Sequence, residues 1–147
     1  LLSEAGNPCI ADPGNIIVAY AHERGAEVVP LIGPNSILMA LIASGFNGQQ
    51  FSFHGYLPIH SADRIRKIKA LESELNKSTA TQIFMETPFR NDSLLKDLLE
   101  NLQPNAKLCI ACDITLETEF IKTKTVVDWR KSIPELHKRY CIFVLGK

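Results

Sequence analysis

The sequence has no hydrophobic run long enough to cross a lipid bilayer and no excess of either charge. Its most apolar stretch, residues 37–43, is far shorter than the roughly 20 residues that a membrane-spanning helix needs. Lysine plus arginine number 16, and aspartate plus glutamate also number 16. This balance gives no global attraction to nucleic acid or to an acidic membrane, although it can conceal a local basic patch. We expect no membrane partner and a cytoplasmic location.

The sequence also lacks the motifs of metal sites and of common nucleophilic enzymes. Cys109 and Cys112 form a C-x-x-C pair, but they face opposite sides of a strand, and no second pair or histidine follows at zinc-binding spacing. We therefore expect no metal and interpret the cysteines as reduced core thiols of a cytosolic protein. These cysteines are Cys9, Cys109, Cys112 and Cys141. No histidine accompanies a serine or cysteine in a nucleophile motif, although His54 and His60 are candidates for lining a site.

What remains is the composition of a globular α/β protein. The 147 residues are 46% hydrophobic and 22% charged, enough for a core in one domain or two small ones. The chain does not begin with methionine, and Leu1-Leu2 leads directly into a loop. We expect this pair to be the end of a buried strand, so that the sequence enters a domain partway through.

The first part of the chain has the pattern of an α/β unit. Residues 15–24 are expected to form a helix, because Gly14-Asn15 offers a cap and Gly25 a stop. Residues 27–32 are expected to form a buried strand. Residues 37–44 are expected to form a helix that is buried because it is apolar on all sides. This order predicts part of a parallel-sheet domain.

A polar stretch at residues 47–50 predicts a boundary, with one domain at 1–47 and a second at 48–147. In the second domain, one helix is expected to be capped by Ser61, a second to begin at Asn91 or Asp92, and a short third helix to span 127–131. The expected strands are 51–56, 81–86, 107–112, 119–126 at an edge, and 140–145. The predicted fold class is α/β: a remnant of a parallel-sheet N-terminal domain followed by a mixed-sheet C-terminal domain.

Two glycine- and proline-containing loops are candidate ligand sites. Ala5-Gly6-Asn7-Pro8 and Gly33-Pro34-Asn35-Ser36 each stand between an apolar segment and a helix. Glycine permits a close approach of the backbone to a ligand. Ligands of open α/β sheets bind at the carboxyl ends of strands, so we expect the two loops to lie side by side. The alternative is a pair of rigid connections with no ligand.

Two further loops follow expected strands of the second domain. Met85-Glu86-Thr87-Pro88-Phe89-Arg90 contains a carboxylate and a guanidinium, which either form a simple ion pair or line a cleft. Polar residues also cluster after the next strand, and the alternative for them is a solvated turn. These residues are Asp113, Thr115, Glu117 and Glu119.

Taken in order, these segments resemble the tetrapyrrole (corrin/porphyrin) methylase family of class III methyltransferases, and within it the ribosomal RNA small-subunit methyltransferase I branch. The matching blocks are SEAGNPCIADPG at 3–14, PLIGPNSILMALIASGF at 30–46, FSFHGYLP at 51–58, IFMETPFR at 83–90, CDITLETEF at 112–120 and IFVLGK at 142–147. Some side chains depart from the branch pattern. Asn7 stands where threonine is usual, and Met85 and Phe89 replace a tyrosine and a histidine. The family's first glycine-rich loop has no counterpart, so the chain resembles a fragment.

The resemblance implies S-adenosyl-L-methionine as cofactor, bound in a cleft between two domains. The implied cofactor-binding residues are Ala5, Gly6, Asn7, Ile10, Asn35, Ser36, Met85, Glu86 and Thr115. Glu86 is a candidate for accepting the acceptor's proton, and Arg90 for contacting an RNA phosphate or pairing with Glu86. Because part of the cleft is missing, we expect this chain alone to be inactive and to bind cofactor weakly or not at all.

The resemblance leaves three functions open. The first is methylation of RNA, by this branch a ribose 2′-hydroxyl of 16S ribosomal RNA. The second is methylation of a tetrapyrrole or another small molecule. The third is a non-catalytic dimerisation or binding module, since family members are typically homodimers.

Overall fold

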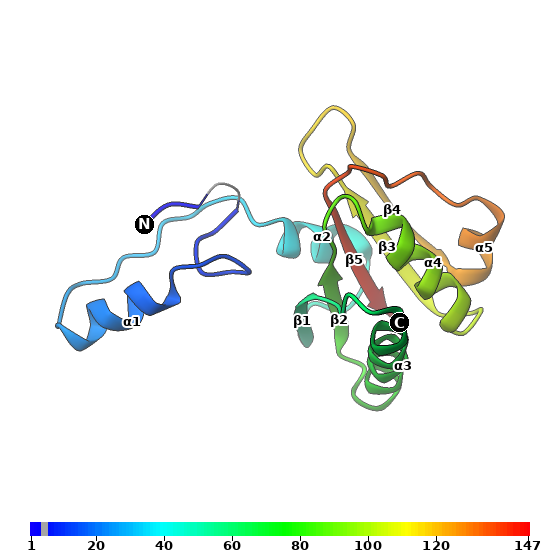
Figure 1. Ribbon diagram of the computed structural model, residues 1–147, viewed down its shortest axis with the longest axis horizontal. Helices are drawn as coiled ribbons and strands as arrows, with labels where there is room; N and C mark the ends of the chain where they lie inside the picture. The colour runs from blue at the N-terminus through cyan, green and yellow to red at the C-terminus, as the bar shows by residue number, and fades with distance from the viewer. Residues whose placement is uncertain (4–5) are drawn as a thin grey trace. The chain divides into compact units, whose positions relative to one another are not determined.

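The computed structural model describes residues 1–3 and 6–147 and divides into two compact units (Figure 1). Unit 1 comprises residues 1–36 and unit 2 residues 37–147. None of the helices in the described residues is both long and apolar enough to cross a membrane. The domain boundary expected near residue 47 remains a prediction.

Unit 2 is built on a mixed five-stranded sheet, as the sequence predicted. Its strands are β1 (Phe51–Tyr56), β2 (Thr81–Met85), β3 (Lys107–Cys112), β4 (Phe120–Thr125) and β5 (Cys141–Gly146). Their order is β1-β2-β5-β3-β4. β1 and β2 are parallel, whereas every other neighbouring pair is antiparallel. β4 is at an edge, as expected, and the last strand lies in the middle of the sheet.

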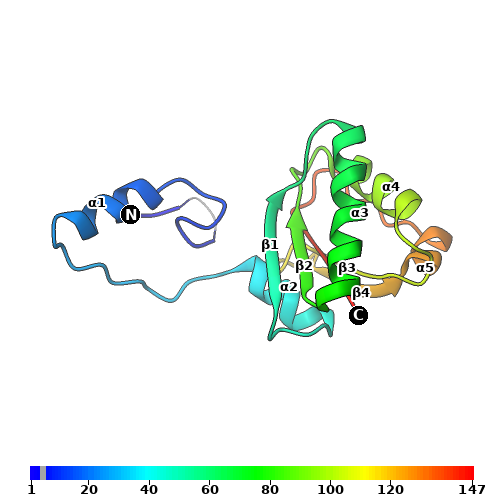
Figure 2. The same ribbon diagram turned by 90° about the horizontal axis from the view of Figure 1, so that it is seen from below.

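Helices cover both faces of this sheet (Figure 2). They are α2 (Ser36–Ser44), α3 (Ser61–Ser78), α4 (Asn91–Asn101) and α5 (Val126–Lys131). Leucines of α3 and α4 and Trp129 of α5 pack on one face, against Phe84 and Phe143. Ala40 and Leu41 of α2 pack on the other face, against Ile83 and Val144. Alternate residues of each central strand therefore serve two separate cores.

The apolar helix α2 is only half buried, so the prediction that it is buried on all sides was wrong. Ile37, Ala40 and Leu41 face the sheet. Leu38, Met39 and Ile42 are exposed. A helix resting on one sheet face buries only one stripe unless a further layer covers it.

Ser61 is not the cap of α3, contrary to the sequence prediction. It is the first helical residue, His60 holds the cap position, and the Ser61 hydroxyl donates to Asp97 Oδ2 at 3.1 Å. Asp97 also accepts from Arg64 Nε at 2.7 Å, in an ion pair that is buried between α3 and α4. The guanidinium further donates to Ile59 O and to the Ser93 hydroxyl. Ser61 therefore contributes to helix packing rather than to capping.

The expectation of four reduced cysteines was wrong for two of them. Cys112 and Cys141 form a disulfide, while Cys9 and Cys109 are free. The pair is directly opposed on antiparallel β3 and β5, with a Cα–Cα distance of 4.2 Å. Directly opposed residues at this spacing point their side chains to the same face. Cys109 lies on the other face of β3, as the C-x-x-C spacing predicted, and burial raises the pKa of its thiol.

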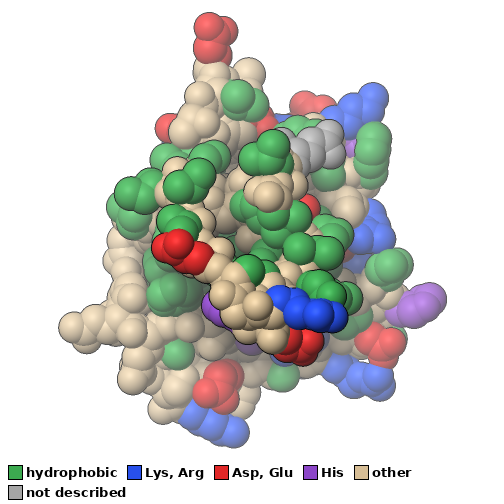
Figure 3. All heavy atoms as spheres, turned by 90° about the vertical axis from the view of Figure 1, so that its left-hand side faces the viewer, with side chains coloured by type: hydrophobic (Ala, Val, Ile, Leu, Met, Phe, Trp, Pro, Cys, Tyr) green, Lys and Arg blue, Asp and Glu red, His purple; other side chains and the backbone are tan. Residues whose placement is uncertain are grey.

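Unit 1 contains α1 (Asn15–Glu23), close to the predicted helix, which is preceded by Gly14 with a φ of 139°. No residue of α1 is buried. Hydrophobic side chains are spread over the face viewed in Figure 3. The exposed hydrophobic residues of unit 1 include Leu1, Leu2, Ile16, Ile17, Tyr20, Val29, Leu31 and Ile32.

Both buried strands predicted in unit 1 were wrong. Residues 26–35 form neither helix nor strand, and residues 1–3 form no strand either. An apolar run becomes a strand only where another strand accepts and donates its backbone hydrogen bonds. The described residues of unit 1 contain no such partner, so Leu31 and Ile32 remain exposed.

Candidate functional site

The two predicted ligand loops lie against each other within unit 1. A β-carbon added at Gly33 would lie 2.7 Å from Asn7 Oδ1, so the Asn7 side chain would have to shift to admit one. A β-carbon added at Gly6 would lie 3.8 Å from the Pro34 carbonyl oxygen. Gly6 also has a φ of 72°, in the left-handed region that glycine adopts without strain. The side-by-side arrangement is therefore confirmed for these loops.

The remaining candidates of unit 1 flank these loops. Ser3 Oγ donates to Gly6 O at 2.7 Å and closes the first loop. Ile10 is exposed, between Cys9 and Ala11, which both have positive φ. Asn35 is half-buried and Ser36, the first residue of α2, is exposed. Ala5, which was also predicted to bind cofactor, lies outside the described residues.

Three loops of unit 2 meet at one end of the sheet. Loop 86–90 follows β2, loop 113–119 follows β3, and segment 132–140 precedes β5. They share this end because Met85 pairs with Ile142, and Cys112 pairs with Cys141. The candidates Met85, Glu86 and Thr115 therefore lie at the same end of one sheet. Of the histidine candidates, His54 hydrogen-bonds Gln82, and His60 holds the cap position of α3.

Glu86 is a buried carboxylate with one unused oxygen. Its Oε1 accepts from the Thr87 N–H and from Arg90 Nη2, each at 2.6 Å. Its side chain is 0% exposed, whereas that of Arg90 is 33% exposed. Glu86 Oε2 and Arg90 Nε have no hydrogen-bond partner among the described residues. Buried polar atoms are costly to leave unpaired, so these two atoms mark a place where a polar group of a ligand would be stabilised.

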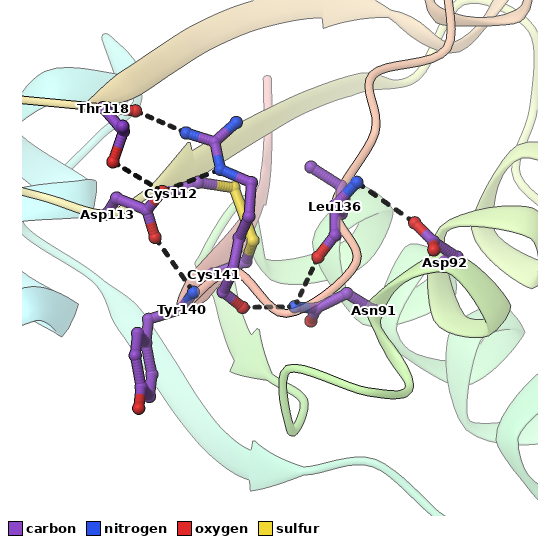
Figure 4. A network of polar contacts seen from close by, with 9 residues as sticks. Asn91, Asp92, Cys112, Asp113, Thr118, Leu136, Tyr140 and Cys141 are labelled. Atoms are coloured by element: carbon purple, nitrogen blue, oxygen red, sulfur yellow. Dashed lines mark hydrogen bonds and ion pairs between the residues drawn. A yellow bond between two sulfur atoms is a disulfide. The ribbon is translucent and has the colours of Figure 1, made fainter.

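Asn91 ties loop 86–90 to segment 132–140 (Figure 4). Its Nδ2 donates to Arg139 O at 2.7 Å and to Leu136 O at 3.4 Å. The Lys138 N–H donates to Pro88 O at 3.0 Å. Sequence reasoning identified Asn91 only as the start of a helix, because its partners lie more than 40 residues later in the chain.

Asp113 anchors loop 113–119 rather than belonging to a solvated turn. It accepts from Arg139 Nε at 2.7 Å, and from the Tyr140 N–H and the Thr118 hydroxyl at 3.1 Å (Figure 4). Burial raises the pKa of this carboxyl, but the hydrogen bonds from Arg139, Tyr140 and Thr118 outweigh burial and hold the pKa below its usual value.

Residues 115–119 of this loop are exposed. Thr115 is exposed, has a φ of 74°, and donates its N–H to Glu119 Oε2 at 2.7 Å. Glu117 is exposed as well. The loop therefore presents Thr115 on a backbone that Asp113 and Glu119 hold in place at either side.

Comparison with known proteins gives consistent relatives, although no family model matches the chain. A ribosomal RNA small subunit methyltransferase I from Vibrio cholerae is 40% identical over 122 residues, which are 83% of this chain and 41% of the relative. The protein of the same name from Buchnera aphidicola of Schizaphis graminum is 32% identical over 148 residues, covering 99% of this chain and 50% of the relative. The chain thus spans about half the length of the curated relatives it matches.

Solved structures share the fold at low sequence identity. The methyltransferase CobJ aligns with a TM-score of 0.61 and 18% identity, over 97% of this chain and 62% of that chain. A uroporphyrin-III C-methyl transferase from Thermus thermophilus, complexed with S-adenyl homocysteine, aligns with a TM-score of 0.54 and 16% identity, over 97% and 63%. The chain is therefore similar in sequence to ribosomal RNA small subunit methyltransferase I over about half the length of those relatives, and it shares its fold with these two methyltransferase structures.

Proposed function

We propose that the chain is part of a methyltransferase that uses S-adenosyl-L-methionine to methylate RNA of the small ribosomal subunit, at a ribose 2′-hydroxyl. The observation that carries the proposal is the buried Glu86, whose second oxygen has no partner among the described residues, at a sheet end that also holds Thr115. The names of the curated relatives support the RNA acceptor. A cytoplasmic homodimer with a domain boundary between residues 47 and 48 completes the proposal.

The residues present fit this cofactor. Gly33 lies against the Asn7 side chain of the other loop, and Glu86 Oε2 can accept from a hydroxyl or amino group. Gly6, Asn7, Ile10, Asn35 and Ser36 would hold the cofactor from unit 1. Met85, Glu86 and Thr115 would hold it from unit 2. The cofactor supplies a methyl group activated by its sulfonium, so the protein mainly aligns the acceptor and excludes water.

Glu86 and Arg90 have separate roles in this proposal. Glu86 would accept the proton of the acceptor hydroxyl at its unpaired oxygen. Arg90 holds Glu86 through one Nη and keeps about a third of its side chain exposed, which is enough to contact a phosphate. The ion pair thus orients the carboxylate while the outer part of the guanidinium remains available.

The test is a titration of the isotope-labelled chain with S-adenosylhomocysteine, followed by NMR so that even millimolar binding is detected. We expect shifts in loops 6–8, 33–36, 86–90 and 113–117, and weaker shifts in Glu86→Gln. Glu100→Gln, an exposed glutamate of α4, is the matched control and is expected to behave like the parent chain. Shifts confined to other parts of the chain would contradict the proposed site.

The small-molecule alternative is favoured by the fold shared with the uroporphyrin-III C-methyl transferase. Transfer of a labelled methyl group by the whole protein, to small-subunit RNA or to a uroporphyrinogen, separates the two acceptors. A non-catalytic module would dimerise in sedimentation experiments but transfer the methyl group to neither.

A further inference from the structure

Exposed aromatic rings and basic groups gather where loop 86–90 meets segment 132–140. We call these residues, Phe89, His137, Lys138 and Tyr140, the aromatic–basic surface. Phe89 is 71% exposed and Tyr140 is 74% exposed. Rings of this size usually bury most of their area, so two such rings on one sheet end form an unusual feature of unit 2.

The backbone under this surface is held rigidly. The Lys138 N–H donates to Pro88 O, and Asn91 donates to Arg139 O, which fixes one segment against the other. The Tyr140 N–H donates to Asp113, and in Figure 4 the Tyr140 ring points away from that network. The Phe89 ring meets the His137 ring edge-on, with 6.0 Å between centroids. The rings are therefore presented on a fixed frame, which lowers the entropy cost of binding.

The charges beside these rings favour an anion. Lys138 is exposed and forms no ion pair within residues 1–3 and 6–147, and Arg90 is partly exposed next to Phe89. Two carboxylates at this end of the sheet are paired, because Glu86 pairs with Arg90 and Asp113 pairs with Arg139, while Glu135 is an exposed carboxylate of segment 132–140. Although the chain as a whole carries no net charge, this surface presents Lys138 and the outer part of Arg90, while the carboxylates of Glu86 and Asp113 are buried.

We propose that the aromatic–basic surface binds single-stranded RNA, with bases stacked on Phe89 and Tyr140 and phosphates contacting Lys138, His137 and Arg90. Stacking on exposed rings requires unpaired bases, and a basic groove beside them follows the backbone. This inference rests on the proposed function and deepens it, since it assigns the acceptor RNA to one end of the unit 2 sheet, beside Glu86.

The test is binding of the chain to a fluorescent single-stranded RNA of about 12 nucleotides, followed by anisotropy. We expect Tyr140→Ala and Phe89→Ala each to weaken binding by about 5- to 100-fold, while Tyr140→Phe retains it. We expect Lys138→Ala to lower the slope of log affinity against log salt by about 0.7. Duplex RNA of the same length should bind more weakly than the single strand.

Two controls match the tested side chains. Phe51 is 41% exposed and starts β1, at the other end of the sheet, so Phe51→Ala should bind RNA as the parent does. Lys96 is exposed on α4, and Lys96→Ala should leave the salt slope unchanged. Equal losses in the controls, or parent-like binding in Tyr140→Ala and Phe89→Ala, would overturn the inference. A change in self-association alone would overturn it too, because the surface would then contact a second copy.

The outcome can be separated from that of the proposed function. If S-adenosylhomocysteine shifts Glu86 and Thr115 but the surface variants bind RNA normally, the methyltransferase proposal stands and this inference fails. If the surface variants lose RNA but S-adenosylhomocysteine shifts residues elsewhere and not Glu86, the RNA surface stands and the cofactor proposal fails.

Discussion

Asp113 has three hydrogen-bond donors around one carboxylate, and two of them come from residues 26 and 27 positions later in the chain. From the sequence, Asp113 was one of four clustered polar residues, and nothing indicated which of them would anchor the loop. Glu86 was easier to identify, because it lies at the end of a predicted strand and Arg90 follows four residues later, within reach of an ion pair. The sequence could not predict that Glu86 Oε2 is buried without a hydrogen-bond partner, because this depends on how the surrounding residues enclose it.

The lowered pKa of Asp113 predicts a pH-dependent stability. Because folding lowers this pKa, the stabilisation is complete above the unfolded value of about 3.9 and is lost as the pH falls through the lower folded pKa. Asp113→Asn should therefore reduce the free energy of unfolding by about 1–3 kcal/mol at neutral pH. In urea unfolding, the difference from the parent should shrink as the pH falls below 4. Asp63→Asn, at an exposed ion pair, is the control and should change little.

The disulfide predicts a specific thiol count. Alkylation of the unfolded, unreduced chain should modify Cys9 and Cys109 and spare Cys112 and Cys141. In the folded chain, Cys9 should react faster, because Cys109 is buried and its pKa is raised. Mass spectrometry gives the count directly, and four modified cysteines without reduction would contradict the pairing.

At the scale of elements, the strands of unit 2 were predictable, whereas their partners were not. Alternation and apolar runs located β1 to β5 within about one residue, since each strand packs at least one face on a core. The same signal failed at residues 27–32, where the described residues offer no neighbouring strand. The spacing of apolar residues therefore indicates that a segment can form a strand, but a strand forms only where a neighbouring strand pairs with it.

Gly146 of β5 packs directly against the Phe46 ring, which leaves no room for a side chain. A β-carbon at this position of β5 would overlap the Phe46 ring. Gly146→Ala should therefore lower the free energy of unfolding by about 1–3 kcal/mol, measured by denaturant melts. Phe46→Leu in the same chain should recover part of the loss. Gly48→Ala is the matched control, because its β-carbon would meet Leu41 at an ordinary 3.8 Å.

At the scale of the whole molecule, the two units differ in how many of their side chains are buried. Unit 2 has two cores, whereas the helix of unit 1 buries no residue. Segments with few buried contacts open at low cost and are cut first by proteases. Limited trypsin digestion should therefore cleave after Arg24 before it cleaves within α3. Mass spectrometry of early fragments tests this, and a first cut at Arg66 or Lys67 would count against it.

The length of the chain predicts weak cofactor binding. Since it spans about half of its curated relatives, the cofactor would contact only part of its usual surroundings here. In calorimetry, S-adenosylhomocysteine should bind the 147-residue chain more weakly than it binds the Vibrio cholerae relative. Equal affinities would show that these residues hold the cofactor alone.

The position of β5 has a consequence for how the protein is made. A ribosome releases the chain from its first residue onward, and β5 is the last strand of the described sheet although it stands between β2 and β3. Until it emerges, β1-β2 and β3-β4 are two separate ribbons, each with an open hydrogen-bonding edge. Such edges readily pair with other chains. The sheet therefore depends on β5 to join its two halves, and both ribbons keep their exposed edges until that strand has emerged.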